Sequence, residues 1–282
     1  MSSVKLIADS GATKAEWCLI KGKKKINVFT QGISPYFLTA AQIVAILKQE
    51  LVPALKSAEV GEIYYYGTGC INVNNVSIVK KALRTVFTEA EKVEVTHDVM
   101  GAARALYGDE KGVACILGTG SSACFYNGKK ITINKPGLGY VLGDEGSGAY
   151  LGKKVLQYYL YKTFDEELNG RFELKYKLTP SEVLDNIYKK PMANRYLASF
   201  APFLSENRGH YMVENIIEDS INDFFFQHIC KFRESWTQPV SFVGGISFYF
   251  KDVLEELCRS YEFTLGKILK NPMEGLSVYH SK

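Results

Sequence analysis

Residues 6–20 read LIADSGATKAEWCLI, and this stretch decides the fold. An apolar strand runs into Asp9, small residues continue to Thr13, and a second apolar strand begins after Lys14. A tight turn by itself needs Gly or Asn at only one or two positions. The unbroken run of small residues beside a carboxylate therefore indicates more than a reversal of the chain.

Two segments of the chain share one order of strand, small-residue turn, strand, basic turn and strand. The first covers residues 4–29 and the second covers residues 113–134, with DSGAT at 9–13 and GTGS at 118–121 as the small-residue turns. Short strands joined by Gly-containing loops are typical of hairpins. A duplicated β-meander in a chain of this length predicts two similar domains.

The small-residue turns have a chemical explanation. Residues without bulky side chains let backbone N–H groups approach an anion, and successive N–H groups form an anion-binding nest. Two such turns could hold a polyphosphate from both sides. Asp9 would then hold Mg²⁺ through water, because Mg²⁺ keeps much of its hydration shell, and the Thr13 hydroxyl could donate to a phosphate. Structural hairpins with Asp9 as an Asx-turn residue are the alternative, but the two turns together favour a nucleotide.

Composition excludes several classes of protein. The chain has 282 residues, of which 46% are hydrophobic and 23% charged, with a net charge of +4, as in soluble globular proteins. The basic run KGKKK at 21–25 falls at an expected hairpin turn, which favours a solvated loop over nucleic-acid binding. No apolar stretch approaches the roughly 20 residues that span a bilayer, and the N-terminus lacks a signal-peptide pattern. We expect a cytoplasmic protein without nucleic-acid or membrane partners.

The cysteines and histidines do not form metal-binding patterns. None of the six cysteines forms a CxxC pair, and most lie in apolar runs, as reduced buried thiols do. The four histidines show no zinc spacing, and His210 and His228 read as ordinary helix residues. The aromatic helix expected at 210–233 reads as core or as a dimer face. We expect no structural metal.

Several motifs resemble those of known proteins. DSGATK resembles the phosphate-1 motif of the actin-like, sugar-kinase and Hsp70 ATPase superfamily, and LGTGSS at 117–122 resembles phosphate-2. SFVGGIS at 241–247, followed by the helix YFKDVLEEL, resembles the adenosine motif. GLGYVLGDEGSG at 137–148 and THDVMGAARA at 96–105 more closely resemble BadF/BadG-type ATPases and N-acetylglucosamine kinases.

The resemblance implies a fold and a domain division. The fold is α/β, with two ribonuclease-H-like domains of the actin-like ATPase type on either side of a nucleotide cleft. The N-terminal domain would span residues 1–109. Residues 110–282 would form the C-terminal domain with a helical part, and the last helix is a candidate to pack back on the N-terminal domain.

Asp98 matches the catalytic carboxylate of the resembled family. It follows the strand VEVTH and opens the helix VMGAARALYG, at the strand end where open α/β sheets bind ligands. Asp is also a favoured N-cap, worth about 1 kcal/mol, so capping alone is the competing explanation.

The resemblance also implies binding positions. Those for ATP are Asp9, Ser10, Gly11, Ala12, Thr13, Lys14, Gly118, Thr119, Gly120, Ser121, Gly244 and Gly245. Those for substrate are Ser34, Thr68, Gly137, Gly139, Asp144 and Glu145, whose acids and hydroxyls suit sugar hydroxyls. A helix entry would explain the acids of GDEGSG but not the glycines before them. Ser34 stands where the kinases carry Asn, which leaves the exact sugar open.

These expectations define a leading function and its alternatives. The leading one is an ATP- and Mg²⁺-dependent kinase of N-acetylglucosamine or glucosamine that yields the 6-phosphate, with a homodimer left open. An N-acetylmuramic acid kinase is an alternative. So is a BadF-type ATPase activator of a 2-hydroxyacyl-CoA dehydratase, which carries an iron–sulfur cluster between its subunits. Cys115 and Cys124 lie within expected strands, which argues against that cluster.

Overall fold

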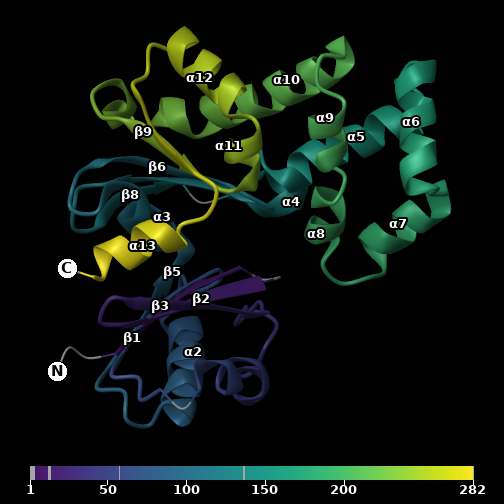
Figure 1. The fold of residues 1–282 in the computed structure, drawn as a ribbon. Helices are drawn as coiled ribbons and strands as arrows, with labels where there is room; N and C mark the ends of the chain where they lie inside the picture. The colour runs from purple at the N-terminus through teal and green to yellow at the C-terminus, as the bar shows by residue number, and fades with distance from the viewer. Residues whose placement is uncertain (1–3, 12–13, 57, 136, 282) are drawn as a thin grey trace. The chain divides into compact units, whose positions relative to one another are not determined.

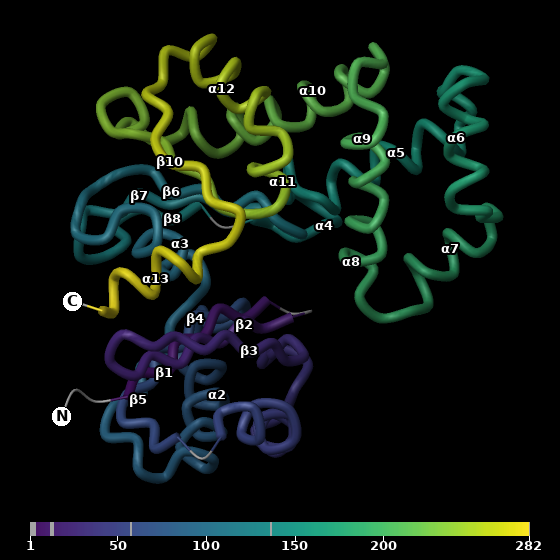
Figure 2. Tube along the Cα trace, viewed as in Figure 1, coloured from purple at the N-terminus to yellow at the C-terminus, as the bar shows by residue number. Residues whose placement is uncertain are grey.

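The computed structural model describes residues 4–11, 14–56, 58–135 and 137–281. Contacts divide the chain into two compact units (Figures 1 and 2). Unit 1 comprises Met1–Glu110 and Asn271–Lys282, and unit 2 comprises Lys111–Lys270. Ala12 and Thr13, which were predicted to bind ATP, lie outside the described residues.

Unit 1 contains a five-stranded mixed sheet in the order β3-β2-β1-β4-β5. Its strands are β1 (Lys5–Ser10), β2 (Lys14–Lys21), β3 (Lys24–Gln31), β4 (Glu62–Gly67) and β5 (Lys92–His97). The first three form the antiparallel meander, and β1, β4 and β5 run parallel. The first meander expected from the sequence is therefore confirmed.

Helices cover both faces of this sheet (Figure 1). They are α1 (Ala40–Ile46), a π-helical turn (Leu47–Leu51), a 3₁₀ turn (Pro53–Leu55), α2 (Val73–Val86), α3 (Asp98–Tyr107) and α13 (Met273–Tyr279). Side chains alternate along a strand, so Tyr65 joins the core formed with α1 and α2. The next residue, Tyr66, instead lies directly beneath Gly101 of α3.

The C-terminal segment returns to unit 1, where α13 packs on α3, β1 and β2. The ring of His280 stacks on Tyr64, and its Nε2 lies 2.7 Å from the hydroxyl of Tyr66. The Nζ of Lys5 donates to the His280 carbonyl over 2.6 Å. Burial, with repulsion from Arg104 and two lysines, lowers the pKa of His280 to about 3, so this ring is neutral at physiological pH.

Unit 2 repeats the sheet of unit 1. Its order is β10-β9-β6-β7-β8, formed by β6 (Gly112–Leu117), β7 (Ser121–Tyr126), β8 (Ile131–Lys135), β9 (Val240–Val243) and β10 (Leu265–Leu269). Read from β8, a three-stranded antiparallel meander is again followed by two parallel strands. The predicted duplication is confirmed at the level of topology, and with it the α/β fold of two similar domains.

Most of the helical residues belong to unit 2 (Figure 1). The α-helices are α4 (Gly139–Leu142), α5 (Gly148–Leu160), α6 (Glu166–Tyr176), α7 (Pro180–Tyr188), α8 (Ala193–Ala198), α9 (Pro202–Glu206), α10 (Tyr211–Gln227), α11 (Gly245–Tyr249) and α12 (Lys251–Ser260). Two 3₁₀ turns, Ile229–Lys231 and Arg233–Trp236, follow α10. The helix expected after the adenosine motif begins earlier, at Gly245, and breaks at Phe250.

The core of unit 2 accounts for the aromatic helix. Phe224 and Phe225 of α10 are fully buried in the core of unit 2, where Phe225 stacks on Phe242 of β9, whereas Phe226 is exposed. All six cysteines are free thiols, and five are buried. Within the described ranges, no helix is both long and apolar enough to cross a membrane.

Candidate active site

Three polar side chains lie along one edge of the unit 1 sheet. Asp9 is near the end of β1, Thr68 follows β4, and Asp98 follows β5. Because these parallel strands are in register, with Ser10 opposite Gly67 and Gly67 opposite His97, their carboxyl ends meet at one edge. The fold thus brings together the predicted metal-binding, substrate-binding and catalytic residues of this unit.

Asp9 is in an environment that opposes its ionisation. Burial, followed by repulsion from Asp98 and Glu16, raises its pKa from 3.8 to about 7. Glu16 lies directly across the β1–β2 hairpin from Asp9, and burial raises its pKa as well. Sequence analysis missed Glu16, although pairing the two arms of the hairpin would have placed it opposite Asp9.

Asp98 is held by its neighbours in a fixed orientation. The Val99 N–H donates to its Oδ1 over 2.9 Å, and the Thr68 hydroxyl is a second hydrogen-bond partner. Burial raises the pKa of Asp98, whereas His97 and these hydrogen bonds oppose the rise. The N-cap of α3 is His97, and Asp98 is the first helical residue. The carboxylate thus satisfies an N–H group of the first helical turn, and its catalytic role stays a prediction.

The other predicted unit 1 residues have structural contacts. The Ile33 N–H donates to the fully buried Ser10 hydroxyl over 3.1 Å, which ties β1 to the loop after β3. The Gly11 N–H donates to the Lys14 carbonyl over 3.0 Å. The Lys14 ammonium lies 3.7 Å from the centre of the Phe29 ring. Ser34 is buried, and its carbonyl accepts two backbone N–H groups.

The carboxylates of unit 1 have the donor chemistry that Mg²⁺ prefers. Asp9, Glu16 and Asp98 repel one another electrostatically, and a cation would relieve that repulsion. Within the described parts of the chain, no cluster of three or more His, Cys, Asp or Glu residues could hold a metal by itself. The residues therefore fit a hydrated Mg²⁺ that also binds phosphate oxygens, and not an all-protein metal cage.

In unit 2 the phosphate-2 turn is fastened to the start of α5. The Gly118 N–H donates to the Gly120 carbonyl over 3.0 Å and closes the turn. The N–H groups of Gly148 and Ala149 donate to the carbonyls of Gly118 and Thr119 over 2.8 and 3.0 Å. The turn and the helix N-terminus therefore form one rigid surface, with backbone atoms facing outward.

Asp144 fastens the glycine-rich segment to this turn. Its Oδ1 accepts the Gly139 N–H over 3.2 Å, and the Ser121 backbone is a second partner. A Cβ on Gly137 would lie 2.4 Å from that oxygen and 2.1 Å from the Ser121 carbonyl. Burial raises the pKa of Asp144, and these backbone contacts oppose the rise. This packing explains the glycine at 137, while direct sugar contact by Asp144 stays a prediction.

Helix α10 supports the rest of the GDEGSG segment. The Nε2 of His228 lies 3.2 Å from Oε2 of Glu145, and the His228 ring stacks on Phe224. A Cβ on Gly146 would lie 2.9 Å from the Phe224 Cβ. His228 was expected to be an ordinary helix residue, but it instead holds one of the predicted substrate-binding acids.

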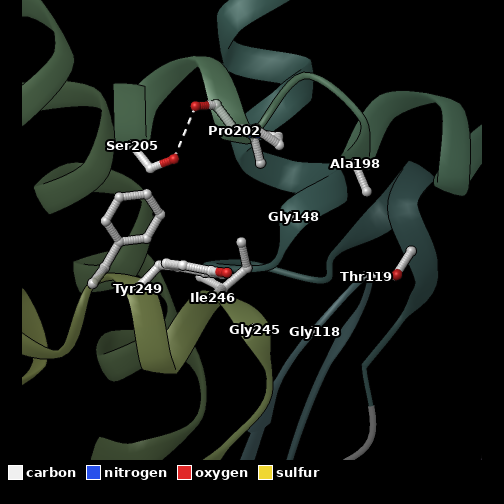
Figure 3. A pocket seen from close by; sticks show the side chains of 11 residues that line it. Gly118, Thr119, Gly148, Ala198, Pro202, Ser205, Gly245, Ile246 and Tyr249 are labelled. Atoms are coloured by element: carbon white, nitrogen blue, oxygen red, sulfur yellow. Dashed lines mark hydrogen bonds between the residues drawn. The ribbon is translucent and has the colours of Figure 1, made fainter. Parts of the chain in front are cut away.

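A cavity of about 530 Å³ opens beside the phosphate-2 turn (Figure 3). Its lining comprises Gly118, Thr119, Gly148, Ala198, Ala201, Pro202, Ser205, Gly245, Ile246, Tyr249 and Phe250. Thr119 and Tyr249 lie at opposite ends in Figure 3. Residues of the predicted phosphate-2 and adenosine motifs both line this cavity. Its wall from α8 and α9 was not predicted, because small residues in helices form no recognisable binding motif.

Glycines give this cavity its shape. At Gly244 the backbone has φ +132° and a Cβ would lie 2.2 Å from the Leu117 carbonyl, so only glycine fits. At Gly118 and Gly245, by contrast, a Cβ would meet no atom within 4 Å. Both of these residues line the cavity, so the missing side chains leave room for a ligand.

Three solved structures are similar to this chain. The "Putative N-acetylglucosamine Kinase" from Porphyromonas gingivalis is 37% identical, with 98% of both chains covered and a TM-score of 0.94. The "Putative N-acetylglucosamine Kinase" from Chromobacterium violaceum is 18% identical over 98% of both chains, with a TM-score of 0.64. MreB 5 of Spiroplasma citri, solved with AMPPNP, is 10% identical over 100% of this chain and 97% of its own, with a TM-score of 0.59.

These similarities define the class and the family. The two distant structures establish the two-domain fold of actin-like ATPases. The chain belongs to the same family as the Porphyromonas gingivalis protein. No protein-family profile and no curated protein sequence matches the chain.

The raised pKa of Asp9 predicts a pH-dependent stability. An unfolded Asp loses its proton near pH 4, whereas folded Asp9 keeps its proton up to about pH 7. Between these values the folded protein binds more protons than the unfolded chain, so the free energy of unfolding falls as the pH rises. We expect Asp9→Asn to raise the melting temperature at pH 8 by at least roughly 2–4 °C, equivalent to about 1 kcal/mol, and to have little effect at pH 4. Thermal unfolding between pH 4 and pH 8 measures this.

The control for this measurement is Asp185→Asn, which changes an exposed acid paired with Lys189 on α7. Its effect on the melting temperature should be small at every pH. A stabilisation by Asp9→Asn that is equal at pH 4 and pH 8 would contradict the environment described for Asp9.

Proposed function

We propose that this chain is an ATP-dependent sugar kinase that phosphorylates an amino sugar, N-acetylglucosamine or glucosamine, on its 6-hydroxyl. The family relationship to the Porphyromonas gingivalis protein supports the substrate class. The observation that carries the chemistry is Asp98, a carboxylate with two hydrogen-bond partners and a raised pKa at the sheet edge.

Asp98 suits the role of base in phosphoryl transfer. The charge of the transition state spreads over the phosphoryl oxygens, so most of the catalysis comes from positioning and electrostatics. An acceptor hydroxyl that donates to Asp98 would be oriented toward the phosphorus, and its proton would pass to the carboxylate late in the reaction. A raised pKa makes the carboxylate a better proton acceptor, and Thr68 and the Val99 N–H fix its direction.

The unit 2 cavity suits a nucleotide. Its volume of about 530 Å³ is of the size that holds small-molecule ligands. The phosphate-2 turn at one end offers compact backbone for phosphates, and the apolar helix walls at the other end suit a base. Mg²⁺ would neutralise charge on the phosphates, and Asp9, with Glu16 nearby, would hold its water ligands.

The competing ATPase-activator function finds less support in the cysteines. Cys115 and Cys124 are completely buried in the neighbouring strands β6 and β7. Burial raises the pKa of both thiols, which disfavours the thiolates that an iron–sulfur cluster needs. Both residues belong to the core of unit 2.

A coupled assay of ADP release over a panel of sugars tests the proposal. We expect turnover with N-acetylglucosamine or glucosamine, and little turnover with neutral hexoses; N-acetylmuramic acid belongs in the same panel. Asp98→Asn should lower kcat at least about 10³-fold while the dissociation constant for ADP changes less than about threefold, because this residue acts on the acceptor. Asp185→Asn is the matched control and should keep full turnover.

The outcomes of this assay are distinct. ATP hydrolysis that no sugar stimulates would contradict the kinase function. Near-normal turnover by Asp98→Asn would remove Asp98 from the chemistry without refuting the function. The proposal requires both units to act on one pair of substrates, and turnover is the direct test of that requirement.

Two helical glycines provide a matched test of the nucleotide pocket. Gly245 and Gly170 each have no atom within 4 Å of a built Cβ, but only Gly245 lines the cavity. Gly245→Leu should raise the dissociation constant for ADP at least about tenfold, because the new side chain occupies space that the ligand needs. Gly170→Leu, on α6, should leave it unchanged.

Isothermal titration calorimetry measures both affinities, and thermal unfolding checks that both variants fold. Neither substitution requires a positive φ, so both should keep a melting temperature close to that of the parent protein. Equal ADP affinities for the two variants would place the nucleotide elsewhere.

A further inference from the structure

The end of the cavity farthest from Thr119 has few groups that could recognise a base by hydrogen bonding. Among the described residues that line the cavity, none carries an amide, carboxylate, imidazole or guanidinium side chain. Its polar side chains there are Ser205 and Tyr249. The Ser205 hydroxyl donates to the Pro202 carbonyl over 2.9 Å, a bond visible in Figure 3. The Tyr249 hydroxyl accepts a hydrogen bond from the Lys270 ammonium over 3.2 Å, and its own O–H can still donate.

The backbone carbonyls of the two helical walls are also engaged. A helix directs its carbonyls along its own axis and pairs them internally, which leaves them unavailable to a ligand beside it. The carbonyls that already accept a hydrogen bond from the protein are those of Ala198, Ala201, Pro202, Ile246 and Phe250. Arg208 lies near the Phe250 ring, but its guanidinium is bound to Asp252 and Glu214.

Adenine and guanine differ mainly in hydrogen bonding. Adenine carries an amino group where guanine carries a carbonyl, whereas the two bicyclic rings are nearly the same in size. A site built to hydrogen-bond one ligand rejects the other by 10⁴-fold or more, because its own buried groups are left unpaired. A pocket that recognises only shape and apolar surface discriminates weakly between ligands of similar size.

We propose that this pocket holds the base by shape and apolar contact, and that the protein accepts purine nucleoside triphosphates generally, with GTP and ITP serving as phosphoryl donors beside ATP. This inference rests on the proposed kinase function and extends it to the donor. The smaller pyrimidines fill less of the cavity and lose apolar contact with Ile246 and Pro202. They are therefore weaker donors than the purines.

The test compares donors at a saturating concentration of the preferred sugar. Initial rates with ATP, GTP, ITP, CTP and UTP, followed as sugar phosphate formed, give kcat/KM for each nucleotide. The values for ATP, GTP and ITP should agree within about 30-fold, and CTP and UTP should fall below them. A preference for ATP over GTP greater than about 30-fold would overturn the inference.

A matched variant tests Ser205, whose hydroxyl lies at the end of the cavity proposed for the base and bonds within its own helix. Ser205→Ala removes that hydroxyl and keeps the helix, since alanine favours helical structure. The ratio of kcat/KM for ATP to that for GTP should change less than about threefold. A larger change would show that Ser205 reads the base, and the inference would be wrong.

Failure of this inference can be separated from failure of the kinase function. If no nucleotide supports phosphoryl transfer, the kinase proposal fails, but the pocket can still be tested by binding. The dissociation constants for ADP and GDP, measured by calorimetry on the full chain, should then agree within about 30-fold. Binding of ADP with a larger advantage over GDP would contradict a pocket that reads only shape.

Discussion

Electrostatic repulsion between Asp9 and Asp98, held at neighbouring strand ends of one sheet, is the constraint on which the rest of the site depends. Burial raises the pKa of both acids, and repulsion from Asp98 raises the pKa of Asp9 further. A protein gains no stability from such an arrangement. The parallel pairing of β1, β4 and β5 maintains it, and a cation with a polyphosphate would relieve it.

In unit 2 the predicted site is held together by hydrogen bonds to the backbone, and not by interactions between charged side chains. Asp144 is tied to main-chain N–H groups, and glycines allow its carboxylate to lie against the phosphate-2 turn. The carbonyls of this turn accept hydrogen bonds from the first N–H groups of α5. Helix α10 then fixes the segment from the other side through Glu145 and His228. The turn is thus hydrogen-bonded on both sides, and the cavity beside it has no charged side chain among its described lining residues.

Local patterns in the sequence predicted the strands well. The meanders follow from short apolar runs separated by Gly-containing turns. Asp98 could be placed because it directly follows a strand. These features depend on neighbours in the sequence, which is why pattern reasoning reaches them.

What the sequence did not reveal depends on contacts between distant segments. The α8–α9 wall of the cavity is built from alanine, proline and serine, which have no distinctive chemistry. His228 acquires its partner from a loop more than 80 residues earlier in the chain. The Ser10 hydroxyl accepts a hydrogen bond from the Ile33 N–H, a contact between distant segments that the sequence does not indicate, and its role in ATP binding stays a prediction. Only the packed structure distinguishes a side chain that faces a ligand from one that faces the core.

The proposed function carries the expectation that Asp9 loses its proton when a nucleotide binds together with a hydrated cation. Its most direct test is calorimetry with a non-hydrolysable ATP analogue near pH 7, with Mg²⁺ or with EDTA, in buffers of different ionisation enthalpy. The account predicts at least about tenfold tighter binding with Mg²⁺ and release of roughly half a proton, since Asp9 has a pKa of about 7. Equal affinities in Mg²⁺ and EDTA, without proton release, would contradict it.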